Sequence, residues 1–250
     1  MSPLVVSLIA FVIVFGGALL GMCVTLPESH LRDEIKDVIR LSAGLIGTIS
    51  GLVLALLISS AKSSYDASNT QIKQITSNII YLDILLEQYG PETNTLRVAL
   101  RDTVPRMVDR IWNERINGNK SEPFVATTEA VALIERIQEL KPDSEAKRDL
   151  QARMLSVVAN SQQIRFDLFA HAHDSISTPF LVILIFWLTI IFASFGLFSR
   201  PNPIVIVTFF VGALSVSGAV FLILEMDRPF AGLLQISREP LMHTLPPLAL

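Results

Sequence analysis

Long apolar segments with almost no charge lie toward both ends of the chain, and most charged residues lie between them. Four of these segments reach the length of roughly 20 residues that a helix needs to cross the hydrocarbon core of a bilayer. They occupy residues 4–25, 38–61, 180–199 and 203–224. The pattern predicts an all-α membrane protein with four transmembrane helices, two within residues 1–61 and two in a hairpin over residues 179–225.

A water-exposed helical insert is predicted between the second and third membrane helices. Residues 62–178 hold 14 of the 20 Lys and Arg residues and 16 of the 23 Asp and Glu residues. A stripe of mostly apolar positions recurs there at alternating spacings of three and four, the heptad pattern of packed helices. The stripe consists of Tyr65, Ser68, Ile72, Ile75, Ile79, Leu82 and Leu86.

The second membrane helix is predicted to run on into the insert as one helix to about residue 89. No Gly or Pro interrupts the insert part of the stripe before Gly90-Pro91. Shorter helices are predicted to follow, the last of them leading back to the membrane. The stripe has two open interpretations, which are packing inside one chain and additional packing against the same helix of other subunits around a central neck.

Composition and motifs narrow the possible functions. A net charge of -3 argues against a nucleic-acid partner, and one cysteine cannot form an internal disulfide. The sequence lacks the motifs of phosphate-binding loops, dinucleotide folds, serine hydrolases and zinc proteases, so we predict no enzyme, catalytic residue, cofactor or metal site. Asp167, His171 and Asp174 share a helix face, but a solvated face explains them more simply than a cation site.

The second membrane helix has an unusual stripe of small residues. Continuing the heptad spacing backwards from Tyr65 reaches, in order, Ala61, Ile58, Leu54, Gly51, Gly47, Gly44 and Arg40. Small residues allow close helix packing in lipid, so ordinary packing within a bundle is one interpretation. The other is a pore lined by the three glycines, with an apolar constriction at Leu54 or Ile58. Arg40 at the pore mouth would then raise the local anion concentration.

The segment after the fourth membrane helix, residues 226–250, is predicted to lie at the membrane interface. Asp227 and Arg228 stand at a helix exit, where charges need polar partners, and Phe230 is expected to be buried. Lys and Arg residues near the spans are slightly more numerous on the insert side than on the opposite side. This bias predicts that the insert and both termini are cytoplasmic.

Several segments resemble the bacterial bestrophin-like family. They are residues 47–66, then Tyr89, Gly90, Pro91, Glu92, Arg97 and Arg101, and finally Asp227, Arg228, Pro229, Phe230 and Gly232. The resemblance covers nearly the whole chain in the same order and implies a bestrophin-like topology. These motif residues are expected to be structural.

The resemblance also implies a homo-oligomer, a pentamer by analogy with true bestrophins, in the bacterial inner membrane. Its second helices would surround a pore for small inorganic anions. The second helix lacks the aromatic neck residues of true bestrophins, and no acidic calcium clasp follows the fourth span, so calcium gating is not implied. Two functions follow: a weakly anion-preferring ion channel, or a non-conducting membrane scaffold or sensor whose insert binds a cytoplasmic partner.

Overall fold

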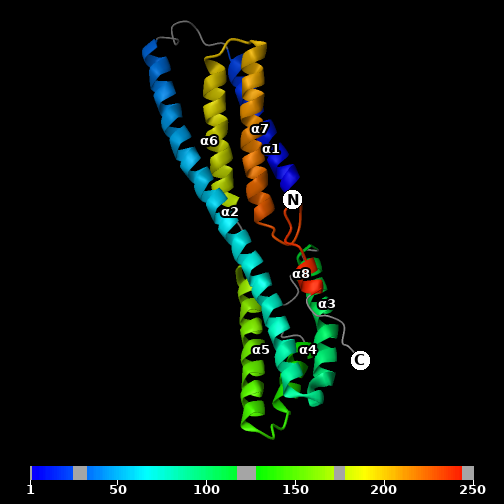
Figure 1. The fold of residues 1–250 in the computed structure, drawn as a ribbon. Coiled ribbons are helices and arrows are strands. Elements are labelled where there is room, and N and C mark those ends of the chain that lie inside the picture. The colour runs from blue at the N-terminus through cyan, green and yellow to red at the C-terminus, as the bar shows by residue number, and fades with distance from the viewer. Residues whose placement is uncertain (1, 25–32, 117–127, 172–177, 244–250) are drawn as a thin grey trace. The chain divides into compact units, whose positions relative to one another are not determined.

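The computed structural model describes residues 2–24, 33–116, 128–171 and 178–243, and every element of regular structure in these ranges is a helix (Figure 1). The chain divides into two compact units. Residues 1–64 and 175–227 form the first, which we call the membrane unit, and residues 65–174 and 228–250 form the second, the helical unit.

Within the described ranges, four helices are long and apolar enough to span a bilayer, as the sequence predicted. They are α1 (Pro3–Cys23), α2 (Asp33–Tyr89), α6 (Thr178–Leu197) and α7 (Pro203–Met226). Proline occupies the first turn of α1 and α7, where its missing N–H would have had no partner within the helix. The Asn202 side chain accepts the backbone N–H of Ile204 at 3.0 Å and so caps α7.

The predicted continuity of the second helix is confirmed. α2 is one helix of 57 residues, and it contributes residues 33–64 to the membrane unit and residues 65–89 to the helical unit. No residue after Gly51 breaks helical geometry until Gly90, which adopts a φ of +127° that L side chains rarely reach. Pro91 follows and opens a single 3₁₀ turn, Pro91–Thr93.

The membrane unit is held together by a very close approach of α1 and α6, with α7 also packed on α1 (Figure 1). A Cβ atom on Gly21 would lie 2.2 Å from the carbonyl oxygen of Ala193, and one on Gly196 would lie 2.1 Å from that of Ala18. The Ser217 hydroxyl donates to the Ser7 carbonyl at 2.6 Å and ties α7 to α1. The tight glycine contact of this bundle therefore lies between α1 and α6, a pair that the sequence did not single out.

Gly21→Ala is expected to destabilise the membrane unit by about 1–3 kcal/mol, because the added methyl group meets backbone atoms that cannot move aside. Gly16→Ala on the same helix is the matched control, since a Cβ there would have no neighbour within 4 Å. Thermal unfolding of the detergent-purified chain compares the two. Equal melting temperatures for the two variants would contradict the close α1–α6 contact.

The helical unit packs the second part of α2 with α3 (Asn94–Ile116), α4 (Thr128–Gln138), α5 (Glu145–His171) and the short α8 (Glu239–Met242). The apolar members of the predicted heptad stripe fill its two cores. These buried side chains are Ile72, Ile75, Ile79, Leu82 and Leu86. Packing within one chain therefore occupies this stripe, so any contact with another subunit needs a different face of α2.

The chain after α7 is divided between core and surface. Phe230, Ile236 and Leu241 are buried in a core cluster of the helical unit together with residues of α2, α3 and α5. Leu233 and Leu234 remain 78% and 41% exposed. The predicted contact of residues 226–250 with the membrane interface therefore rests on these two leucines and on Met242, which is 45% exposed.

Candidate functional site

The membrane part of α2 buries one narrow seam within the chain. Its buried residues, Ala43, Ser50, Leu57 and Ala61, recur at seven and four, so they share one helix face. Leu57 and Ala61 form a cluster with Leu184 of α6. The seam does not include any of the residues that we predicted to line a pore.

The predicted pore-lining stripe divides into two groups along this seam. Gly47 and Leu54 stand beside it and are partly covered, Gly47 by the Ile191 side chain at 3.9 Å from an added Cβ. Leu54 packs on the cluster around Leu57. Gly44, Gly51 and Ile58 lie further round the helix and are exposed, and an added Cβ on either glycine would meet nothing within 4 Å.

The exposed surface of α2 has two distinct strips. One strip is made of three small residues, Gly44, Gly51 and Ala55, and two β-branched residues, Thr48 and Ile58. The other strip carries large aliphatic side chains, all at least 63% exposed: Leu41, Leu45, Leu52 and Leu56. Large aliphatic side chains suit lipid tails, whereas small residues allow another helix to approach closely. The two strips therefore suit different neighbours.

Arg40, the predicted pore-mouth residue, is largely exposed near the start of α2. Its guanidinium lies 3.9 Å from the Asp37 carboxylate, an exposed pair one turn apart. It also borders a recess of about 350 Å³ that is lined by Phe195, Phe198 and Thr208, among other residues. Asp37 reduces the field of Arg40, so a preference for anions that depends on this arginine would be weak.

Two motif arginines of the helical unit converge on an acid that the sequence did not single out. The side chain of Asp83 on α2 accepts hydrogen bonds from Arg97 Nε at 2.9 Å and from Arg101 Nη1 at 3.0 Å. The second carboxylate oxygen accepts one further bond from each arginine at 3.1 Å. Asp83 is buried, and the two guanidinium groups are only 13% and 16% exposed. The geometry is that of a bidentate ion-pair network that joins α2 to α3.

The charge state of Asp83 follows from two opposing effects. Burial alone would raise the pKa of this carboxyl, but the hydrogen bonds from Arg97 and Arg101 outweigh burial and hold the pKa below its usual value. The bond to Asp83 in turn raises the pKa of Arg97. The network is therefore fully ionised at neutral pH, and its ion pairs hold α2 and α3 together.

The motif residues around Gly90 form the turn between α2 and α3. The Thr93 hydroxyl donates to the carbonyls of Leu86 and Gly90 and closes the end of α2. Burial raises the pKa of Tyr89, whose ring carries the Lys147 ammonium at 5.2 Å from its centroid. Lys147 also pairs with Glu92 at 3.0 Å, which fastens the turn to α5. These contacts hold the turn between α2 and α3 together and connect it to α5.

The closing motif is fastened to α3 by one aromatic residue. Phe230 is 1% exposed, as the sequence predicted, and meets the Trp112 ring edge-on at 5.2 Å. The Trp112 Nε1–H donates to the Ile236 carbonyl at 3.1 Å, and the Ile236 N–H donates to the Pro229 carbonyl at 2.7 Å. Gly232 between them has a φ of +94°, which explains a glycine at this position. Asp227 and Arg228 each have an interaction partner.

Metal chemistry finds no support in the described ranges. No three His, Cys, Asp or Glu side chains among these residues lie close enough together to hold a metal ion. Asp174 and the side chain of His171, which share a predicted helix face with Asp167, lie outside the residues whose placement is described.

In the part of the chain that the structure describes, four helices of membrane-spanning length and a helical unit joined by the Asp83 ion pairs define an all-helical membrane protein. A model of the Bestrophin-like domain matches residues 10–241, so the chain belongs to the Bestrophin-like family. This confirms the resemblance seen in the sequence and suggests a channel-like function in a membrane. No curated protein and no solved structure shows a significant match to the chain.

Proposed function

We propose that the protein is a homo-oligomeric ion channel whose pore is lined by α2. The observation that carries the proposal is how little of this helix its own chain covers. Only 11% of the most apolar stretch of α2 is buried, against 28% for α1 and 22% each for α6 and α7. A helix so exposed needs other neighbours, and its small-residue strip suits the same helix of another subunit. Membership of the family supports a pentameric ring.

Ile58 is the better candidate for the constriction of such a pore. Its side chain is 38% exposed and follows Gly44 and Gly51 at intervals of seven, whereas Leu54 packs within its own chain. A ring of apolar side chains can gate a narrow pore by dewetting. Gly47 would then support the helix against α6 rather than line the open path.

The proposed selectivity is weakly for small inorganic anions. Between Arg40 and Ala61, α2 carries no charged residue, so no fixed negative ring can select cations there. Arg40 supplies the nearest positive charge, moderated by Asp37. We place the channel in the bacterial inner membrane, with the insert and both termini in the cytoplasm, on the slight excess of Lys and Arg near the spans on that side.

Planar-bilayer recording of the purified chain tests conduction. Ile58→Ala is expected to raise the unitary conductance several-fold, because an apolar ring at the narrowest point is widened. Leu56→Ala is the matched control, since Leu56 is 69% exposed on the large aliphatic strip and should leave conductance unchanged.

Arg40→Gln is expected to move the reversal potential toward that of a non-selective pore. Silence of wild type and both alanine variants would exclude the channel.

A non-conducting scaffold is the second candidate, and one surface of the helical unit favours it. Ile80, Tyr81 and Ile84 of α2 are each 41–42% exposed and lie on one side of the helix. Such a patch can bind a cytoplasmic partner, but it also suits contact between subunits in a ring. The particle symmetry of the detergent-purified protein separates the two, since a monomer favours the scaffold and a closed ring favours the channel.

A further inference from the structure

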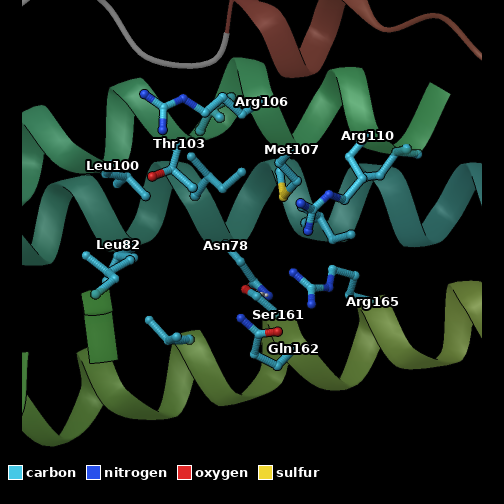
Figure 2. Close-up of a pocket in the computed structure, with 16 residues that line it drawn as sticks. Asn78, Leu82, Leu100, Thr103, Arg106, Met107, Arg110, Ser161, Gln162 and Arg165 are labelled. Carbon is cyan, nitrogen blue, oxygen red and sulfur yellow. Dashed lines mark hydrogen bonds between the residues drawn. The ribbon is translucent and has the colours of Figure 1, made fainter. Parts of the chain in front are cut away.

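The helical unit contains a cavity of about 210 Å³ whose walls come from α2, α3, α4 and α5 (Figure 2). Arg106 and Arg110 line it but are exposed and have partners, whereas Arg165 is buried and its Nε–H has no hydrogen-bond partner among the described residues. The buried side-chain oxygen of Gln162 also lacks a partner there. The cavity has room for roughly seven water molecules at their liquid volume, and water can bond to both groups. Water is therefore a sufficient occupant of this cavity.

A recess of about 350 Å³ in the membrane unit has different surroundings. It lies beside Arg40 near the start of α2, and its other walls come from the end of α6 and the start of α7. Both α6 and α7 have membrane-spanning length, so the short connection between them, residues 198–202, marks one edge of the bilayer. Phe209, the last lining residue of α7, lies about 9 Å along the helix from Pro203. The recess therefore lies where lipid headgroups meet the hydrocarbon.

The walls of the recess are mostly apolar and partly open to the surrounding lipid. Phe195 and Ile204 are 45% and 75% exposed, whereas Phe209 is buried. The Ser199 and Thr208 hydroxyls donate to the carbonyls of Phe195 and Ile204 at 2.8 and 2.9 Å, so they offer a ligand only acceptor oxygens. The apolar groups that a bilayer supplies at this depth are the upper parts of acyl chains, and these walls suit them.

Arg40 supplies the positive charge of the recess. Its side chain is 62% exposed, and its guanidinium lies 3.9 Å from the Asp37 carboxylate, which is longer than a hydrogen bond. The N–H groups of Arg40 can therefore bind a better-placed acceptor. At the edge of a bilayer that acceptor is a lipid phosphate, which takes paired hydrogen bonds from a guanidinium group. Asp37 offsets part of the charge of Arg40, so the lipid does not need a net negative headgroup.

We propose that the recess beside Arg40 binds one phospholipid of the surrounding bilayer. Its phosphate lies on the Arg40 guanidinium, and an acyl chain lies against Phe195 and Ile204. The volume equals that of roughly twelve water molecules, so the recess holds the phosphate and the adjoining part of the lipid rather than the whole molecule. The site stands whether or not the protein conducts, because it needs only the membrane unit of one chain. A bound phosphate would, like Asp37, reduce the field of Arg40.

Native mass spectrometry of the full, delipidated chain in detergent measures binding. The probe is palmitoyl-oleoyl phosphatidylethanolamine, and palmitoyl-oleoyl glycerol is the same molecule without the phosphate headgroup. We expect a saturable site for the phospholipid that binds it roughly fivefold or more tighter than the diacylglycerol, and no displacement by inorganic phosphate. Equal affinity for the diacylglycerol would overturn the proposal. Displacement by inorganic phosphate would also overturn it, because the recess would then be a site for free anions.

Arg40→Gln is expected to weaken binding of the phospholipid roughly fivefold, which corresponds to about 1 kcal/mol for one arginine at a lipid surface. Arg200→Gln is the matched control. Arg200 is exposed and directly follows Ser199, but it does not line the recess. Equal weakening by both variants would mean that general surface charge attracts the lipid, and the site would be rejected.

A second pair of variants tests the recess without changing its charge. Thr208→Trp is expected to fill the recess and to weaken binding at least as much as Arg40→Gln, and it should fold because Thr208 is exposed. Val207→Trp is its control, since Val207 is 60% exposed and does not line the recess. A phospholipid with a diazirine near the ester end of its acyl chain should label peptides covering residues 195–209 in wild type and in Val207→Trp. Labelling that is unchanged in Thr208→Trp would place the lipid elsewhere and overturn the proposal.

Discussion

Asp83→Asn is expected to destabilise the helical unit by about 3 kcal/mol or more, because two guanidinium groups would remain mostly buried without their counter-charge. Asp83 accepts four hydrogen bonds from Arg97 and Arg101, and these bonds join α2 to α3. Hydrogen exchange of peptides covering residues 79–104 measures the loss directly. We expect protection there to fall by more than a hundredfold at neutral pH.

Glu87→Gln is the matched control for this prediction. Glu87 also approaches Arg97, at 3.5 Å, but its side chain is 65% exposed. An exposed ion pair contributes about 0–1 kcal/mol, so exchange should change little. Equal effects of Asp83→Asn and Glu87→Gln would show that burial of the network does not matter.

The same network predicts how stability depends on pH. The pKa of Asp83 is lower in the folded chain than the value of about 3.9 expected when unfolded. Its contribution is therefore fully present above that unfolded value and is lost as the pH falls through the folded value. The stability difference between wild type and Asp83→Asn should shrink between pH 5 and pH 3. A difference that stays constant over this range would contradict the assigned ionisation.

Phe230→Ala is expected to cost about 3 kcal/mol, because it empties a closed core position beside Trp112. Phe230 is 1% exposed, and the loop it anchors also positions the Ile236 carbonyl for the indole N–H. Denaturant unfolding of the detergent-purified chain, followed by exchange protection of residues 104–112, measures the effect. Phe230→Leu should recover part of the loss, since it restores apolar volume.

Leu233→Ala separates this core role from a general effect of the closing segment. Leu233 lies three residues further on and is 78% exposed, so its truncation should change stability by less than about 0.5 kcal/mol. If Leu233 contacts the bilayer, its truncation should still leave the unfolding of the helical unit unchanged. Equal destabilisation by both alanine variants would refute the assignment of Phe230 to the core.

Much of the fold could be predicted because it depends on patterns along one dimension. The length of an uncharged apolar run decides whether a helix can span a bilayer, and this alone located α1, α6 and α7. The absence of Pro and of late Gly in α2 decided its continuity to Tyr89. The three-and-four spacing of Ile72, Ile75 and Ile79 decided which face of that helix is buried.

Other features needed the tertiary structure, because they depend on which residues distant in sequence meet. Among the described residues, glycines occur on α1, α2, α6 and α7. The approaches of Gly21 to Ala193 and of Gly196 to Ala18 bring backbone atoms together and so interlock α1 with α6. The motif arginines Arg97 and Arg101 were visible in the sequence, but their acceptor was not.

The division of the α2 stripe and the burial of Arg165 have the same origin. The heptad pattern places Leu54 and Ile58 on the same stripe. The neighbouring helices decide that Leu54 packs inside its chain and that Ile58 is exposed. Arg165 occupies an ordinary heptad-flanking position in sequence. It becomes a buried cation facing Arg110 only because α3 and α5 pack on either side of the same cavity. The sequence by itself determined the helices and their buried faces, and the packing of those helices decided which polar groups meet.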